Sequence, residues 1–223
     1  MSSRDAILSR VRQSLRVNAA NPERQATVAA RLKGTPRGIV PERGQLPQPE
    51  RVALFCAMAE KVSATVARVT DDDAVPEAVA SYLRDQNLAA TIRMGQDRRL
   101  NDLPWRRTPY ISIKYGPSDG NDQIGISHAF AGVAESGTLV LTSGPDNPTT
   151  LNFLPEIHIV VINENDIVGD YETVWDAIRA KFGRGTMPRT VNFITGPSRS
   201  ADIEQTLLLG AHGPRRLHIV VVG

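Results

Sequence analysis

Two unbroken apolar runs, IHIVVI at residues 157–162 and LHIVVV at residues 217–222, constrain the fold of this chain more than any other feature. A strand with one face in water alternates apolar and polar side chains, whereas each run is apolar apart from a single histidine. Such runs are typical of parallel strands that helices cover on both faces. A chain of 223 residues is long enough to supply those helices around one sizeable core.

Helix-like and strand-like segments alternate along the rest of the chain. Apolar residues spaced three and four positions apart predict helices, and short β-branched runs predict strands. The predicted helices cover residues 2–15, 49–69, 74–87, 170–183 and 201–209. The predicted strands cover residues 89–94, 110–115, 124–130, 137–144, 156–163, 191–195 and 216–222. This order, which ends in a β-α-β unit, predicts an α/β fold with a mostly parallel sheet.

The N-terminal part of the chain differs from the rest. An apolar stripe that includes Ile7 and Val11, surrounded by arginines, predicts an amphipathic helix. Five prolines and three glycines between residues 18 and 50 then predict a linker. We therefore predict an N-terminal arm of helix and linker at residues 1–48 and an α/β domain at residues 49–223.

Positive charge is concentrated in this arm. The formal net charge is only +2, yet residues 1–50 hold nine Lys and Arg against four Asp and Glu. The basic residues are dispersed and no aromatic residues interleave with them, so we favour a solvated or protein-docking arm over a nucleic-acid-binding one. No apolar run approaches the roughly 20 residues that a membrane span needs.

Cys56 is the single cysteine of the sequence. One thiol excludes an internal disulfide, and it excludes an iron–sulfur cluster held by this chain alone, since such clusters need several thiolates. The four histidines show no spacing typical of a metal site, so no metal or other cofactor is expected on this chain. The unpaired cysteine and the lack of a cleavable apolar leader predict a cytoplasmic protein.

Two long stretches resemble a known family. The two stretches are AGVAESGTLVLTSG (131–144) and ITGPSRSADIEQTLLLGAHGPRRLHIVVV (194–222). In that order, they are similar to the signature of the lactate utilization protein C family, which is built on the LUD domain. FLPEIHIVVINENDIV (153–168) and DAILSRVRQSL (5–15) extend the resemblance. The resemblance implies a three-layer α/β/α fold of the sugar-phosphate isomerase and CoA-transferase type. It also implies a subunit of a system that oxidises L-lactate to pyruvate, with iron–sulfur clusters on partner subunits.

The turn after the strand at residues 191–195 is the first candidate ligand site. A phosphate loop would add a Gly-Lys-Ser/Thr sequence, which is absent, and Asp202 would place negative charge in the first turn of the predicted helix. We therefore predict that a small carboxylate binds here, held by Gly196, Ser198, Arg199 and Ser200 with Asp202 close by. The alternative is a capped helix start in which Arg199 pairs with Asp202.

Glu135 and His212 are the candidate catalytic residues. Glu135 lies in Ala134-Glu135-Ser136-Gly137, whereas class I CoA transferases of this broad fold carry Ser-Glu-x-Gly around a glutamate nucleophile. It is predicted to act as a nucleophile, a general base or a hydrogen-bond partner of the turn. His212 lies between two glycines of a loop, where it is free to reach a ligand, and histidine is a common general base. Each has a simpler interpretation, as a solvated carboxylate and as a loop histidine that caps carbonyl groups.

Thr138 and Gly213 complete the predicted binding set, and His158 and His218 are interpreted as hydrogen-bonded core or edge histidines. Three functions stay open from the sequence. The chain is a subunit of a lactate-oxidising complex with iron–sulfur partners, a stand-alone acyl- or CoA-transferring enzyme that uses Glu135, or a non-catalytic scaffold that docks partners through its arm.

Overall fold

The computed structural model describes residues 2–16, 18, 20–34, 36–201 and 207–223. Their contacts divide the chain into two compact units, Met1–Ile39 and Val40–Gly223. Residues 40–48, which the sequence analysis placed in the arm, group with the second unit. No helix among the described residues is long and apolar enough to cross a membrane.

The N-terminal unit consists of two helices. Helix α1 (Ser3–Leu15) begins at a capping box, in which the Ser2 and Asp5 side chains each bond the other's backbone N–H. Helix α2 (Pro22–Gly34) lies where the sequence predicted only a linker. The prolines of this region predicted a linker wrongly for residues 22–34. Pro22 stands at the first helical position, where proline is favoured, and the next twelve residues contain no proline.

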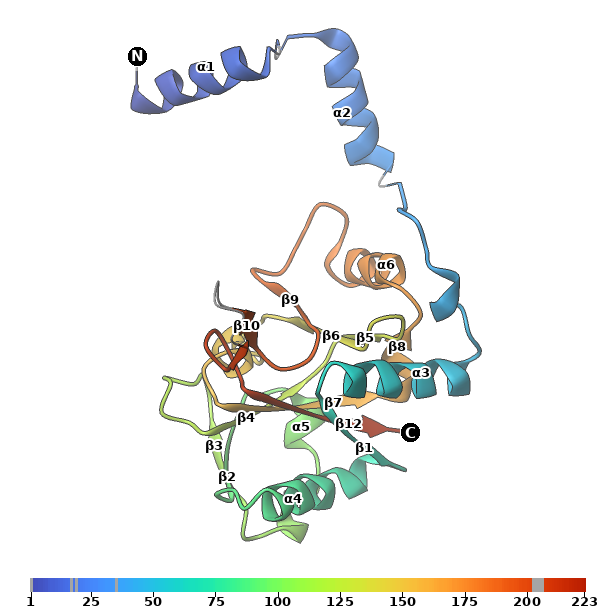
Figure 1. Cartoon of the computed structure of the whole chain (residues 1–223), viewed down its shortest axis with the longest axis vertical. Helices are drawn as coiled ribbons and strands as arrows, with labels where there is room; N and C mark the ends of the chain where they lie inside the picture. Colours follow the sequence, from blue (N-terminus) through green and yellow to red (C-terminus); the bar gives the residue numbers. More distant parts are fainter. Residues whose placement is uncertain (1, 17, 19, 35, 202–206) are drawn as a thin grey trace. The chain divides into compact units, whose positions relative to one another are not determined.

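The C-terminal unit is built on a six-stranded parallel sheet in the order β1-β12-β7-β4-β2-β3 (Figure 1). Its strands are β1 (Thr65–Val69), β2 (Thr91–Met94), β3 (Ser112–Tyr115), β4 (Ile124–His128), β7 (Ile157–Asn163) and β12 (Arg216–Val222). The two apolar runs are β7 and β12, which lie side by side with His158 opposite Leu217. Both strands are almost entirely buried, which confirms the predicted parallel sheet covered on both faces.

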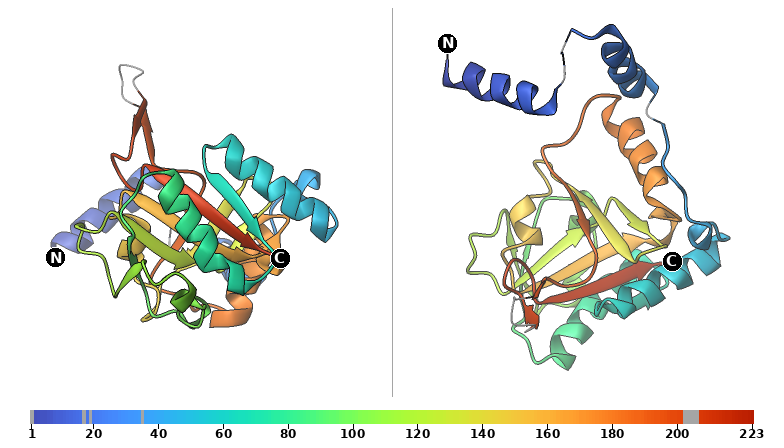
Figure 2. Two further views of the ribbon diagram at one scale, coloured as in Figure 1. Left: turned by 90° about the horizontal axis from the view of Figure 1, so that it is seen from below. Right: turned by 45° about the horizontal axis from the view of Figure 1, so that its top comes forward.

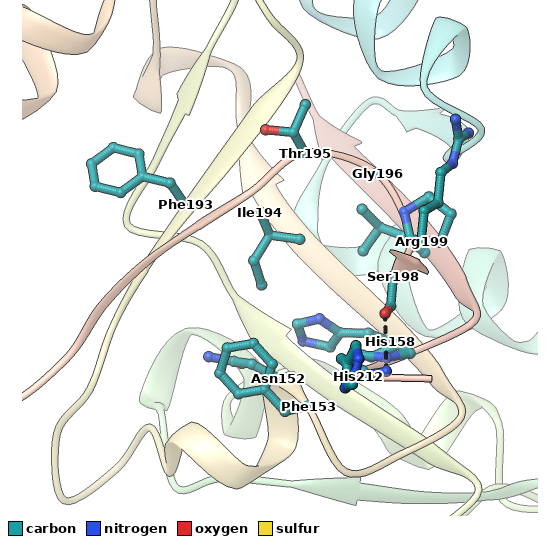
Figure 3. Close-up of a pocket in the computed structure, with 14 residues that line it drawn as sticks. Asn152, Phe153, His158, Phe193, Ile194, Thr195, Gly196, Ser198, Arg199 and His212 are labelled. Carbon is teal, nitrogen blue, oxygen red and sulfur yellow. Dashed lines mark hydrogen bonds between the residues drawn. The ribbon is translucent and has the colours of Figure 1, made fainter. Parts of the chain in front are cut away.

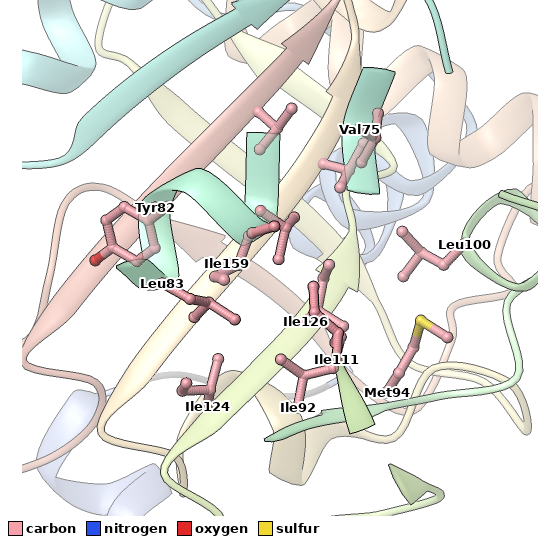
Figure 4. Packing of buried hydrophobic residues seen from close by; sticks show 14 of the residues in the cluster. Val75, Tyr82, Leu83, Ile92, Met94, Leu100, Ile111, Ile124, Ile126 and Ile159 are labelled. Carbon is pink, nitrogen blue, oxygen red and sulfur yellow. The ribbon is translucent and has the colours of Figure 1, made fainter. Parts of the chain in front are cut away.

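Alternate side chains of β7 enter different cores. Ile159 and Val161 pack with α4 (Val75–Asp85) and α5 (Arg98–Asn101) in one cluster of buried residues (Figure 4). Val160 and Ile162 pack on the other face with α3 (Gln48–Lys61), whose Phe55 is fully buried. Since strand residues alternate between faces, one apolar run serves both cores.

A second, four-stranded sheet covers the α3 side, in the order β8-β5-β6-β9. Its strands are β5 (Ala131–Val133), β6 (Thr138–Thr142), β8 (Ile167–Val168) and β9 (Val191–Ile194). Helix α6 (Tyr171–Phe182) packs on its outer face through Val174 and Ile178. Short 3₁₀ helices lie at η1 (Glu42–Gly44), η2 (Asp72–Ala74), η3 (Trp105–Arg107), η4 (Thr149–Asn152) and η5 (Glu164–Asp166).

The β-α-β unit predicted at the C-terminal end is wrong. Strand β9 belongs to the small sheet, and the next described elements are β10 (Arg199–Ala201) and β11 (Leu207–Leu209), which pair antiparallel and project from the side where β12 begins (Figure 2). Ser200 pairs with Leu208, so both ends of the predicted helix are extended, and its middle, residues 202–206, lies outside the described residues. A short apolar run such as Leu207–Leu209 fits a strand as well as a helix, so its periodicity could not distinguish the two structures.

The helix predicted at residues 49–69 is too long. Helix α3 ends at Lys61, Ser63 turns the chain with a φ of 70°, and β1 follows. The β-branched residues that follow this turn favour a strand.

Candidate functional site

A pocket of about 270 Å³ opens where β7 and β12 begin and β9 ends (Figure 3). It is lined by three parts of the chain that are far apart in sequence: the segment from Asn152 to His158, the turn from Phe193 to Arg199, and the loop from His212 to Leu217. A more open pocket of about 540 Å³ adjoins it and shares Phe153, His212 and Gly213.

The turn after β9 is fixed to the end of α3. Gly196 has a φ of +75°, and a Cβ atom there would lie 2.4 Å from the carbonyl oxygen of Val62, the C-cap of α3. The Arg199 guanidinium donates to the same carbonyl oxygen at 2.8 Å and also contacts the Ser63 hydroxyl. A cation at the C-terminal end of a helix complements the helix dipole. Gly196 and Arg199 thus line the pocket and also attach this turn to α3.

Ser198 connects the turn to the loop that contains His212. Its backbone N–H donates to the Pro214 carbonyl at 2.8 Å, and its own carbonyl accepts from the Gly210 N–H at 3.0 Å. Its hydroxyl accepts from the backbone N–H of His212 at 3.4 Å. The structure therefore brings Ser198, Arg199, His212 and Gly213 to one pocket, with the His212 ring exposed. The predicted partner Asp202 lies outside the described residues.

Thr138 lies next to this pocket without lining it. Its hydroxyl is fully buried and contacts the hydroxyls of Ser136 at 2.8 Å, Tyr171 at 2.8 Å and Thr195 at 2.7 Å. Thr195 is an exposed residue of the pocket lining. Thr138 thus joins the small sheet to the pocket through one hydroxyl–hydroxyl contact.

Glu135 lies apart from the residues that line the pocket. It occupies the turn between β5 and β6, is 4% exposed, and has Arg43 Nε 4.0 Å from its Oε2, which has no hydrogen-bond partner among the described residues. Gly44 covers it, because a Cβ on Gly44 would lie 3.3 Å from the Glu135 Cβ and 2.2 Å from the Gly169 carbonyl oxygen. An acyl-transfer role would require this cover to open.

His158 lines the pocket, whereas the sequence analysis interpreted it as a core or edge histidine. Its Nε2 lies 3.0 Å from the Ser127 hydroxyl, and that hydroxyl donates to Asn152 Oδ1 at 3.2 Å. Burial lowers the pKa of His158 to about 3, and its Nδ1 has no partner among the described residues. No local sequence motif indicates this hydrogen-bonded group, because its three residues come from β4, η4 and β7.

His218 lies in the core, as predicted. Its ring stacks on Tyr82 with centroids 3.9 Å apart, and its Nδ1 lies 2.8 Å from the Thr65 hydroxyl. Burial lowers the pKa of His218 to about 4.

A metal or thiol site is not evident in the described part of the chain. No group of three or more His, Cys, Asp and Glu side chains there is arranged to hold a metal ion. Cys56 is half-buried in α3, and burial raises the pKa of its thiol, which disfavours the reactive thiolate.

Several curated relatives of this chain share one name. "Lactate utilization protein C" from Geobacillus sp. (strain WCH70) is 41% identical over 100 residues, which are 44% of this chain and 42% of that protein. "Lactate utilization protein C" from Bacillus subtilis (strain 168) is 39% identical over 100 residues, again 44% of this chain and 42% of the relative. The match thus spans less than half the length of these relatives.

Fold and family comparisons cover more of the chain. The crystal structure of a duf162 family protein from Deinococcus radiodurans aligns with a TM-score of 0.59, covering 80% of this chain and 99% of that one at 21% identity. This likeness and the six-stranded parallel sheet between helices confirm the predicted α/β fold class. The model of the LUD domain matches residues 52–222, which include all strands of both sheets. The chain therefore belongs to the LUD domain family.

Proposed function

We propose that this protein is a subunit of an L-lactate utilization system that oxidises L-lactate to pyruvate, and that its pocket binds a small carboxylate of this kind. The LUD domain, together with curated relatives named for lactate utilization, is the observation that carries the proposal. The pocket volume of about 270 Å³ suits a small ligand, since sites for drug-sized molecules occupy roughly 300–1,000 Å³.

The charges in the pocket favour an anion. Arg199 is the one Lys or Arg side chain among the described lining residues, and its two described partners, a carbonyl group and a hydroxyl, are uncharged. The Ser198 hydroxyl and the exposed His212 ring add hydrogen-bonding groups. A monocarboxylate near Arg199 would gain a charge-assisted contact. It would not have to displace an acidic side chain, because neither described partner of Arg199 is acidic.

Electron transfer is assigned to partner subunits in this proposal. Oxidising lactate removes two electrons, and the single cysteine of this chain is too few for an iron–sulfur cluster. We therefore place iron–sulfur clusters on other proteins of the complex. The N-terminal unit, whose helices have no buried side chains, is our candidate for the docking segment.

Deletion of the gene tests the proposal in the native cell. We expect loss of growth on L-lactate as sole carbon source, unchanged growth on pyruvate, and recovery when the full chain is supplied. Affinity purification of the tagged chain should recover a protein with iron–sulfur absorption. Normal growth on L-lactate in a strain without another lactate dehydrogenase would reject the proposal.

Substitution of Arg199 tests the pocket directly. Arg199→Ala should weaken L-lactate binding by about tenfold, measured by isothermal titration calorimetry, because it removes a charged partner of the carboxylate. Arg199→Lys should keep most of the affinity, since it keeps the charge. Arg215→Ala is the matched control, because Arg215 lines only the adjoining pocket. Equal affinities for wild type and Arg199→Ala would leave this turn with a structural role alone.

A further inference from the structure

The hydrogen bonds around His158 determine which ring nitrogen carries the proton. The Ser127 hydroxyl has one proton, and it donates that proton to Asn152 Oδ1. Its contact with His158 Nε2 therefore requires Nε2 to be the donor. A neutral imidazole carries one N–H, so Nδ1 keeps a free lone pair and acts as an acceptor.

This acceptor is buried and unpaired, and it belongs to a residue that lines the pocket. His158 is 1% exposed and is one of the residues that line the pocket, and its buried Nδ1 has no hydrogen-bond partner among the described residues (Figure 3). Burial lowers the pKa of His158 to about 3, so at neutral pH the ring stays uncharged and Nδ1 stays an acceptor. A buried acceptor without a partner is costly, and a ligand that supplies a donor relieves that cost.

We infer that His158 Nδ1 accepts a hydrogen bond from the ligand's hydroxyl group, and that the pocket thereby selects 2-hydroxy acids over 2-oxo acids and plain carboxylates. The inference rests on the proposed function, in which the pocket binds a small carboxylate. L-Lactate presents an O–H donor, pyruvate presents a carbonyl oxygen that faces the lone pair of Nδ1, and propionate presents neither. A site built around one hydrogen bond rejects ligands that leave its buried group unpaired.

A ligand series on the full chain tests the selection. Isothermal titration with L-lactate, pyruvate and propionate should give lactate the highest affinity, by about threefold to tenfold over each of the others. Nitrogen-15 NMR of the histidine side chains should show His158 protonated at Nε2 and unprotonated at Nδ1. A His158 protonated at Nδ1 would overturn the inference without any ligand.

Two substitutions separate the two ring nitrogens. His158→Gln places an amide near the position of Nε2, so it keeps a donor for Ser127 and removes the acceptor. His158→Asn places an amide oxygen near the position of Nδ1, so it keeps the acceptor. We expect His158→Gln to bind lactate no better than propionate, with propionate affinity unchanged, and His158→Asn to retain a preference for lactate. A general packing role would weaken all three ligands alike.

The outcomes distinguish this inference from the proposed function. If carboxylates bind but wild type does not prefer lactate, the selection by His158 is rejected and the pocket remains a carboxylate site. If none of the three ligands binds wild type, the carboxylate site and the inference built on it both fail. If a variant does not fold, the ligand series and the NMR tautomer of the wild-type protein still test the inference.

Discussion

Lowering the pH from about 7 to about 4.5 is expected to reduce the free energy of unfolding by about 5 kcal/mol. The pKa of His158 is lowered from its ordinary 6.5 to about 3, and that of His218 from 6.5 to about 4, because both rings are buried. Below about pH 6.5 the unfolded chain binds two protons that the folded protein excludes. The stability that depends on these neutral rings is therefore fully present above about pH 6.5. Each histidine lowers the free energy of unfolding by about 1.4 kcal/mol per pH unit as the pH falls toward its folded pKa.

Urea unfolding followed by circular dichroism at a series of pH values measures this loss. His128 should add to it, because burial first, and the charge of Arg99 second, lower its pKa as well. His218→Phe is the informative variant, since a phenyl ring keeps the stack on Tyr82 and cannot be protonated. Its loss of stability over this range should fall by about half. A wild-type midpoint that does not change between pH 6.5 and 4.5 would contradict the burial of these rings.

Replacing Gly196 by alanine is expected to lower the free energy of unfolding by roughly 3 kcal/mol. The backbone φ of +75° is unfavourable for any residue with a Cβ, and that atom would lie 2.4 Å from the Val62 carbonyl oxygen. Relief requires the turn to move away from α3, and Ser198 and Arg199 would move with it. We therefore expect weaker binding of L-lactate together with the lower stability.

Gly144→Ala provides the control for Gly196→Ala. A Cβ at Gly144 meets no atom within 4 Å, so its effect should stay within about 0.5 kcal/mol. Urea midpoints of the two variants at neutral pH make the comparison. Similar midpoints for Gly196→Ala and Gly144→Ala would show that the turn after β9 tolerates a shift from α3.

The parts of the fold that depend on local composition were predictable. The runs at residues 157–162 and 217–222 are adjacent parallel strands. They could be predicted because a strand buried on both faces consists of consecutive apolar residues. The pair β10 and β11 was not predictable, since three leucines in a row do not distinguish a strand from a helix. Its partner strand, not its periodicity, makes Leu207–Leu209 extended.

The candidate site divides in the same way. Ser198, Arg199, His212 and Gly213 were found because they lie in two glycine-containing segments of one recognisable stretch. His158 was missed as a pocket-lining residue, because its hydrogen bonding depends on Ser127, which contacts it, and on Asn152, which bonds Ser127, and these residues meet only in the folded protein. A histidine inside an apolar strand carries no sequence signal that separates a ligand contact from a core contact.

The place of β12 in the sheet has a consequence during synthesis on the ribosome. Strand β12 lies between β1 and β7, yet it follows every other described strand along the chain. Thr65 and His218, which meet across β1 and β12, are 153 positions apart. At about 5–20 residues per second, β1 is made roughly 8–30 s before β12, its neighbour in this sheet. The nascent chain therefore lacks the partner for this strand edge during that time, and an unpaired strand edge can pair with other chains, so we expect a chaperone to help most in this interval.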